Sequence, residues 1–339
     1  MTTISDVAKA AGVSTATVSR VLSNSAAVKP LTRDAVLKAV EALDYKPNAL
    51  ARQMRTQETR TVIVIVPDIS NTFFSEILFS IERCAQKYDY QILIADMHNQ
   101  PNIESYYFQA IQQRTVDGII SLSANVAQKL MEQVAEEYPI VVANQYLENF
   151  NIPNVTINNI NAAEEITEHL IKLGHTHIAH ITSQPSLLLY RDRFNGYISA
   201  LAKHGLPIDL ELVRYGDSSI EGGYKQMTAL LELNKPISAI FAAGDVMAVG
   251  AIKALKSAGL RVPEDIAVVG FDDIEISGFW EPSLTTVRPP KRQIGEVAFE
   301  KLLKLMRKQP LTQMKDILDY EIVIRESCGY HQNERRFVT

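Results

Sequence analysis

Two kinds of hydrophobic spacing divide the chain near residue 60. Before that point, apolar residues recur at the 3.6-residue period of helices, within 4–11, within 15–22 and again at about Thr32–Leu43. After it, short apolar runs alternate with amphipathic stretches. That alternation is typical of parallel strands joined by helices that cover both faces of a sheet. The sequence therefore predicts an N-terminal all-α head followed by an α/β body.

The alternation occurs twice along the body. Strands are predicted at Thr61–Val66, Gln91–Ala95, Gly118–Leu122, Ile140–Ala143, His177–Thr182, Ala239–Ala243 and Ala267–Gly270. Helices are predicted at about Phe74–Tyr88, Ile103–Arg114, Ala127–Glu137, Asn161–Leu173, Arg191–His204, Ile220–Leu233 and Val246–Ala258. Two repeats indicate two lobes with one parallel sheet each. The late segments Thr285–Arg288 and Glu321–Ile324 are expected to cross back between the lobes.

The first two helices have the pattern of a helix-turn-helix. Gly12 ends the first helix where the chain needs a positive φ to turn, and Ser14 suits the N-cap of the second. In the second helix Val18 and Val21 point toward the small core. Its outward face carries Thr15, Ala16, Ser19 and Arg20.

That outward face suits the major groove of DNA. Arg20 can bond guanine O6 and N7, Thr15 can bond bases or phosphates, and Ala16 can contact a thymine methyl group. A helical hairpin with no role in DNA binding is the alternative interpretation.

Residues 47–60 follow the head. Asn48 and the proline before it suit the start of a helix, but the segment is too short to be stably helical alone in water. We expect it to order when two copies meet on DNA, with Met54 as an apolar wedge in the minor groove and Arg52 and Arg55 on the backbone. A plain flexible linker is the alternative.

Charge separates the two parts further. The formal net charge is −5, yet residues 1–60 hold nine Lys/Arg against five Asp/Glu, so the head is +4 and the remainder −9. A basic head on an acidic body places the phosphate-binding surface at one end.

No apolar run approaches the roughly 18 residues of a membrane span, and no apolar signal core begins the chain, so we expect a cytoplasmic protein without membrane contact. Cys84 and Cys328 are expected to be reduced thiols.

Polar and aromatic residues follow several predicted strands of the body, where open α/β sheets bind ligands. The candidates are Phe73, Phe74, Asn144, Gln145, Arg193 and Asp272. An Arg–Asp pair, amides and an aromatic face suit a neutral polyhydroxylated ligand. Two alternatives stay open: Phe74 as a plain core residue, and Arg193 with Asp272 as a structural ion pair.

Other polar motifs predict no further chemistry. His177 and His180 face opposite sides of a predicted strand, and His175 lacks a third ligand, so no metal site is expected. The glycines around Asp245 do not form a dinucleotide fingerprint, and Asp245 is interpreted as the N-cap of the helix that follows. No nucleophile motif is present, so we predict no enzyme and no cofactor.

From Thr3 onward the chain resembles the LacI/GalR transcriptional regulators. The matching motifs are Ile4–Leu22, Tyr45–Asn48, Val66–Ile77, Val116–Gly118, Leu173–His175, Asp245–Ala248, Arg261–Pro263 and Pro282–Thr286. Within the family, the stretch from Arg60 to Leu78 is most similar to the cytidine-repressor branch. Met54 departs from the many members that carry leucine at the wedge, and the softer methionine would specify the DNA bend less sharply.

The resemblance implies a periplasmic-binding-protein-like body with a hinge of three crossovers near residues 158, 287 and 320. It divides the chain into a helix-turn-helix domain (1–46), a hinge helix and linker (47–60) and an effector-binding and dimerisation domain (61–339). The N-lobe would comprise about 61–157 and 288–320, and the C-lobe about 158–287 and 321–339. A homodimer surface is expected around the helix after Phe74 and in 246–280.

The resemblance also completes the predicted sites. The DNA-binding residues are Thr3, Ser14, Thr15, Ala16, Thr17, Ser19, Arg20, Asn24, Tyr45, Asn48, Arg52, Met54 and Arg55. The effector-binding residues are Phe73, Phe74, Asn144, Gln145, Arg193, Ser218 and Asp272. Of these, Phe73, Phe74, Arg193 and Asp272 align with effector contacts of the family's purine repressor, whereas Ser218 replaces an aromatic residue.

Together these features predict a homodimeric, sequence-specific DNA-binding transcriptional regulator, most simply a repressor. Its partners would be double-stranded operator DNA and a small sugar or nucleoside effector whose binding changes the closure of the lobes. A solute-binding protein for sugar transport shares the two-lobed body and is the main alternative. An enzyme on a doubly wound sheet is a third possibility, although the phosphate-loop glycines are missing.

Overall fold

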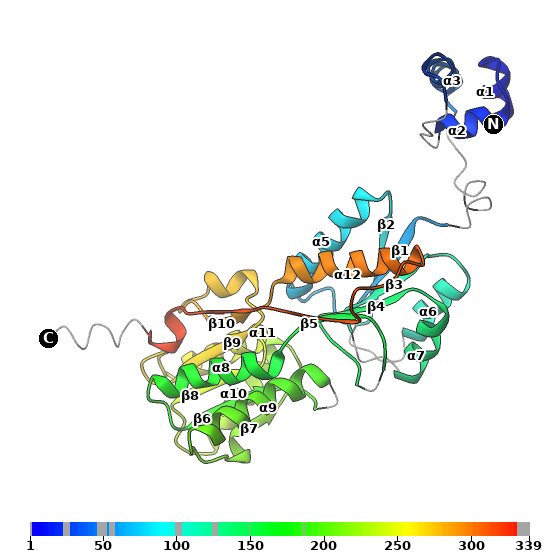
Figure 1. The fold of residues 1–339 in the computed structure, drawn as a ribbon. Coiled ribbons are helices and arrows are strands. Elements are labelled where there is room, and N and C mark those ends of the chain that lie inside the picture. Colours follow the sequence, from blue (N-terminus) through cyan, green and yellow to red (C-terminus); the bar gives the residue numbers. More distant parts are fainter. Residues whose placement is uncertain are drawn as a thin grey trace. The chain divides into compact units, whose positions relative to one another are not determined.

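The computed structural model describes residues 2–22, 28–45, 53, 58–98, 104–123, 128–148, 150–185 and 187–330. The chain divides into two compact units, Met1–Thr59 and Arg60–Thr339, whose elements are drawn in Figure 1. Within the described residues, no helix is long and apolar enough to cross a membrane.

Among the described residues of the first unit, three helices are assigned: α1 (Ile4–Ala10), α2 (Thr15–Leu22) and α3 (Pro30–Ala42). One fully buried valine from each helix, Val7, Val18 and Val36, forms the centre of its core. Gly12 turns the chain between α1 and α2 with a φ of +66°, as predicted. Helix α3 begins two residues before the predicted start because a proline occupies its first position, where no backbone N–H is needed.

The second unit has the two sheets that the sequence predicts. The N-lobe sheet has the strand order β11-β5-β4-β3-β1-β2 and the C-lobe sheet the order β12-β10-β9-β8-β6-β7. All neighbouring strands are parallel except β10 and β12. The N-lobe strands are β1 (Thr61–Val66), β2 (Gln91–Asp96), β3 (Gly118–Ser121), β4 (Ile140–Ala143), β5 (Asn154–Ile157) and β11 (Lys315–Leu318). The C-lobe strands are β6 (Ile178–Thr182), β7 (Val213–Tyr215), β8 (Ala239–Ala242), β9 (Ala267–Phe271), β10 (Thr285–Arg288) and β12 (Glu321–Val323).

Helices cover both faces of each sheet (Figure 1). The N-lobe helices are α5 (Phe73–Lys87), α6 (Glu104–Gln112), α7 (Gln128–Glu137) and α12 (Lys291–Met306), and the C-lobe helices are α8 (Asn159–Lys172), α9 (Leu188–Lys203), α10 (Ile220–Glu232) and α11 (Asp245–Ser257). Three 3-10 turns, Leu210–Leu212, Glu275–Gly278 and Glu326–Cys328, lie on the C-lobe. The chain passes between the lobes at Asn158, at residues 289–290 and at residues 319–320. Both parts of the predicted fold class are therefore confirmed.

Two helices of the C-lobe meet at their backbones. A Cβ atom on Gly223 of α10 would lie 2.2 Å from the backbone oxygen of Met247, and one on Gly250 of α11 would lie 2.0 Å from that of Ile220. No side chain fits at either glycine unless a helix moves. The two helices are thus fixed in one position against each other.

Several elements differ from the predictions. Helix α12 and strands β5, β7 and β11 were not predicted. Asp245 is not an N-cap: Gly244 occupies that position, and Asp245 is the first helical residue, with its carboxylate bonded to Ile274, Ser277 and Thr286. Helix α9 begins at Leu188, three residues earlier than predicted, so Arg193 lies inside the helix rather than at its start.

Candidate functional site

The predicted reading face of the head lies on α2. Thr15, Ala16 and Arg20 are exposed there, and Ser19 is half-buried. Ser14 caps the helix as predicted, because its Oγ accepts a 3.2 Å hydrogen bond from the backbone N of Thr17 and lies 2.9 Å from the Thr17 Oγ1. The exposed face of α2 therefore carries small side chains and one long cation, Arg20. A helix with such a face suits the major groove.

The remaining head residues have structural neighbours of their own. The Thr3 hydroxyl donates to Asp6 over 2.7 Å in a capping box at the start of α1. These bonds hold the pKa of the exposed Asp6 carboxyl below its usual value. Tyr45 is half-buried against the head core. The predicted residues Asn24, Asn48, Arg52, Met54 and Arg55 lie outside the described residues.

A cavity opens between the lobes of the body. It is lined by Pro67, Asp68, Asn71, Phe73, Phe74, Met97, Ser123, Asn144, Gln145, Leu187, Leu189, Tyr190, Ser218 and Asp272. Six of the seven predicted effector residues therefore meet in one place, and Arg193 is the exception. The N-lobe contributes the loops after β1, β2, β3 and β4, and the C-lobe contributes the loops after β6, β7 and β9.

Two phenylalanines form one wall. Phe73 and Phe74 pack edge to face with ring centroids 5.2 Å apart, and both are buried in the N-lobe core. Both rings therefore belong to the N-lobe core and also line the cavity. A core role for Phe74 is thus compatible with the predicted role in effector binding. Asn144 adopts a φ of +64° at the end of β4, and Gln145 donates to the backbone oxygen of Leu122 over 3.4 Å.

Arg193 lies beneath the cavity instead of lining it. Only 1% of its side chain is exposed, and it donates to Asp272 over 2.9 Å and to Asn159 over 3.2 Å. A further bond goes to the backbone oxygen of Ala243, and the guanidinium stacks 3.6 Å from the centroid of the Phe271 ring. The structure thus contains the ion pair considered above as an alternative, and it places Arg193 behind the cavity carboxylate of Asp272. Contact of Arg193 with an effector stays a prediction.

Asp272 is one of two carboxylates, with Asp68, among the described residues that line the cavity. Burial raises the pKa of its carboxyl above the usual value, and Arg193 partly offsets that rise. Its φ of +107° and the +44° of Asp273 place two successive aspartates in the left-handed region, a strained backbone that surrounding bonds must hold. On the same side, Tyr190 and Ser218 share a 2.6 Å hydroxyl–hydroxyl bond. No motif in the sequence analysis pointed to Tyr190.

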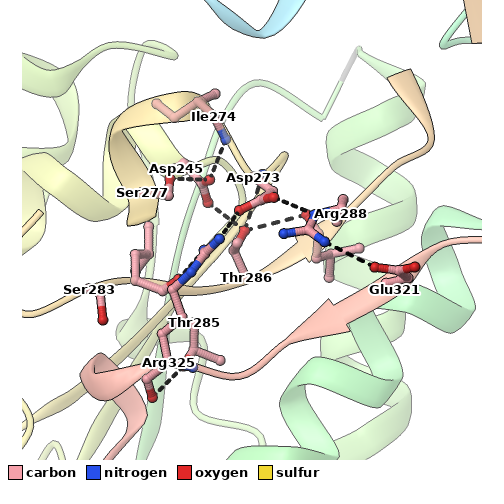
Figure 2. A network of polar contacts seen from close by, with 12 residues as sticks. Asp245, Asp273, Ile274, Ser277, Ser283, Thr285, Thr286, Arg288, Glu321 and Arg325 are labelled. Atoms are coloured by element: carbon pink, nitrogen blue, oxygen red, sulfur yellow. Dashed lines mark hydrogen bonds and ion pairs between the residues drawn. The ribbon is translucent and has the colours of Figure 1, made fainter. Parts of the chain in front are cut away.

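The bonds that hold Asp273 lead to the hinge (Figure 2). Its carboxylate pairs with Arg288 of β10 and, at 2.7 Å, with Arg325 after β12. Burial alone would raise the pKa of Asp273, but these two arginines bring it below the usual value. Arg288 also pairs with Glu321 over 3.1 Å. The two hinge strands of the C-lobe are thereby tied to the residue next to the cavity carboxylate.

A second carboxylate lies under this network. Asp245 is fully buried and accepts bonds from the hydroxyls of Ser277 and Thr286, both at 2.6 Å, and from the backbone N of Ile274 at 3.0 Å (Figure 2). Burial, and then the negative charge of Asp272, raise its pKa to about 7. This carboxylate holds the Glu275–Gly278 turn against strand β10.

The histidines of the Gly174–His180 region do not form a cluster of metal ligands. His180 is fully buried, its Nδ1 lies 2.9 Å from the Phe241 backbone oxygen, and burial lowers its pKa to about 3. Within the described part of the chain, no group of three His, Cys, Asp or Glu side chains is placed to hold a metal ion.

Two segments of the chain match known protein families. Residues 3–48 match the family described as bacterial regulatory proteins, lacI family. Residues 59–318 match the family described as periplasmic binding proteins and sugar binding domain of the LacI family.

Individual proteins agree with both matches. The chain is 37% identical over 326 residues to the HTH-type transcriptional repressor CytR of Escherichia coli (strain K12), covering 96% of each sequence. It is 36% identical over 328 residues to the HTH-type transcriptional regulator RegA of Clostridium saccharobutylicum, covering 96% of this chain and 99% of that one. Its structure is similar to the lac repressor dimer bound to operator and the anti-inducer ONPF, with a TM-score of 0.86, 28% identity and coverage of 96% and 99%. It is also similar to the transcriptional regulator CelR–cellobiose complex, with a TM-score of 0.73, 28% identity and coverage of 96% and 100%.

Proposed function

The chain belongs to the LacI family of bacterial DNA-binding transcriptional regulators, and from that premise we propose that it is a repressor controlled by a sugar or nucleoside bound between its lobes. One observation carries the proposal: a single chain joins the exposed reading face of α2 to a cavity whose walls come from both lobes. A transport protein would need only the second of these features. We infer that the protein acts in the cytoplasm, where operator DNA lies, and we assign it no catalytic step.

The cavity favours an uncharged ligand. Among the described residues that line it, the charged side chains are Asp68 and Asp272. The nearby guanidinium of Arg193 is already committed to Asp272 and to two further acceptors. A phosphate group would therefore meet carboxylates without a free arginine to neutralise it. Hydroxyls that donate to Asp272 and a ring face that covers Phe73 suit a sugar or a nucleoside better.

A homodimer is part of the proposal. Large apolar side chains are exposed on the body where the dimer surface was predicted: Phe79 of α5 is 54% exposed and Phe279 is 84% exposed. Leu93 and Ile94 are also exposed, on β2 at the edge of the N-lobe sheet. Exposed apolar side chains that gather into one patch mark association surfaces, and we infer that these side chains belong to such patches. Two heads held by such a dimer would read two halves of a near-palindromic operator.

Fluorescence anisotropy on the DNA upstream of the chain's own gene tests the DNA-binding part. We expect wild-type protein to prefer this fragment to random DNA at moderate ionic strength. Arg20→Ala should lose affinity for the operator by about tenfold or more, with a much smaller loss on random DNA. Lys38→Ala, which removes an exposed cation of α3, serves as the control for charge alone. Equal losses on both DNAs for Arg20→Ala would refute base reading.

A thermal-shift screen tests the effector part. Sugars, sugar phosphates and nucleosides are added singly, and a ligand at 100 times its Kd should stabilise the body by about 2.7 kcal/mol. We expect hits among neutral compounds. A hit that is confined to phosphorylated compounds would contradict the cavity assignment.

A further inference from the structure

We infer that Tyr146, Glu148, Arg191 and Asp192 form an inter-lobe latch that holds the lobes closed without effector and so sets the strength of the effector response. These four residues lie outside the cavity lining and were not among the predicted site residues. Their regulatory meaning rests on the proposed function, whereas the latch itself can be measured without DNA or ligand.

The latch joins two elements on opposite sides of the cleft. Tyr146 and Glu148 follow strand β4 of the N-lobe, and Arg191 and Asp192 lie on helix α9 of the C-lobe. The Tyr146 hydroxyl lies 3.1 and 3.0 Å from the two carboxylate oxygens of Asp192. Arg191 and Glu148 form a two-bond ion pair, one bond of which measures 3.1 Å. Separation of the lobes at this position would break all of these contacts.

Of the two contacts in the latch, the buried hydrogen bonds between Tyr146 and Asp192 are stronger than the exposed ion pair between Arg191 and Glu148. Asp192 is 6% exposed, and burial raises the pKa of its carboxyl above the usual value. Burial and the Asp192 charge also raise the pKa of Tyr146 to about 12, so the phenol keeps its proton and donates it to the carboxylate at neutral pH. The Arg191–Glu148 pair is exposed by 36% and 46% and contributes less because water screens it.

Each side of the latch is adjacent in sequence to a residue that lines the cavity or that positions a lining residue. Tyr146 directly follows Gln145, which lines the cavity. Asp192 directly precedes Arg193, which positions the cavity carboxylate of Asp272. A ligand that shifts either side of the cavity therefore acts on the backbone that carries the latch. The Lys315 Nζ, at the start of β11, lies 5.1 Å from the centroid of the Tyr146 ring, so a second N-lobe strand contacts the tyrosine.

The latch biases a two-state equilibrium between closed and open lobes. A hydrogen bond to a charged acceptor that exists only in the closed state favours that state by about tenfold or more. An effector that prefers closed lobes then needs a smaller difference in affinity between the two states to produce a given shift. An effector that prefers open lobes needs a larger one. Tyr146 and Asp192 are thus positioning residues for the response, and they do not contact the ligand.

Single-molecule FRET on the full chain tests the latch without DNA or effector. Donor and acceptor are attached at Glu136→Cys on α7 and Lys225→Cys on α10, two exposed positions, while Cys84 and Cys328 are buried and stay unlabelled. Labelled protein is mixed with excess unlabelled protein, so that a dimer carries one labelled protomer. We expect Tyr146→Phe to raise the open-to-closed ratio by about tenfold or more, and Tyr106→Phe, on an exposed tyrosine of α6, to leave it unchanged.

Two further comparisons separate the latch from a general loss of stability. In an Asp192→Ala background, Tyr146→Phe should have no added effect, because its acceptor is gone. Glu148→Arg and Arg191→Glu should each open the lobes, and the two together should close them again. An unchanged FRET distribution in Tyr146→Phe, an undiminished effect in the Asp192→Ala background, or no rescue by the charge exchange would each overturn the inference. A failed screen for effectors would leave these outcomes intact and count only against the proposed function.

Discussion

Replacing Arg193 by methionine should destabilise the body by about 3 kcal/mol at neutral pH. The substitution keeps most of the buried volume but removes every donor of the guanidinium. The carboxylate of Asp272 and the backbone oxygen of Ala243 lose their bonds to it, and the stacking on Phe271 at 3.6 Å is lost as well. Removal of one partner from a buried ion pair costs about 3–5 kcal/mol. The lower end applies because 15% of the Asp272 side chain is exposed at the cavity.

Differential scanning calorimetry measures this loss. For a body of this size, each kcal/mol lowers Tm by roughly 2 °C, so we expect a drop of about 6 °C. The double variant Arg193→Met with Asp272→Asn carries no buried charge at this position and should recover part of the loss.

The penalty should also depend on pH. Without Arg193 the pKa of Asp272 rises further above its usual value, since burial is then opposed by less positive charge. The folded variant therefore holds a proton that the unfolded chain releases above about pH 4, and its stability falls as pH rises from there to the raised pKa. We expect a smaller penalty at pH 5 than at pH 8. A penalty under about 1 kcal/mol, or one that grows as pH falls, would refute the assignment of a buried ion pair.

Three other substitutions test separate parts of the structure. Asp272→Ala should leave operator affinity intact and abolish the response to any effector found, as measured by anisotropy with and without that ligand, and a normal response would contradict the cavity assignment. In wild type, Asp245 should make stability fall as pH rises from about 4 to its pKa of about 7, and Asp245→Asn should flatten that slope in urea unfolding at several pH values; parallel slopes would contradict it. Gly223→Ala should cost about 2 kcal/mol or more, because its Cβ would lie 2.2 Å from the Met247 backbone oxygen, whereas Lys225→Ala on the exposed face should change stability by less than about 0.5 kcal/mol.

The sequence predicts best where one physical signal dominates. Buried parallel strands such as β1 (Thr61–Val66) are apolar throughout, so their positions followed from composition alone. The missed strand β11 (Lys315–Leu318) is short, alternates half-buried and exposed residues, and lies at a sheet edge. Helix α12 has the helical spacing of Ile294, Ala298 and Leu302 but also buries Lys301, which donates to backbone oxygens after the helix. A lysine on the buried face obscures the amphipathic pattern.

The sequence predicted the location of the cavity residues more reliably than the contacts that each side chain makes. Residues that follow parallel strands meet at one cleft, and six of the seven proposed lining residues do so in the structure. Arg193 was assigned to the ligand because its chemistry suits hydroxyls, whereas in the structure each of its three guanidinium nitrogens donates to a protein acceptor: Asn159, Ala243 or Asp272. Asp245 was interpreted as a cap, although its partners are 32 and 41 residues away in sequence. Contacts at such separations depend on the finished fold, and local spacing carries no signal for them.

The backbone contact between α10 and α11 also determines how the body can deform. Because a glycine of each helix lies against the main chain of the other, neither helix can slip along its partner, and α10 and α11 must move together. Rotation of one lobe against the other then takes place at the three crossover segments that join the lobes. In a rotation about these segments, each residue moves in proportion to its distance from them, so the parts of the C-lobe farthest from the hinge move more than the cavity walls.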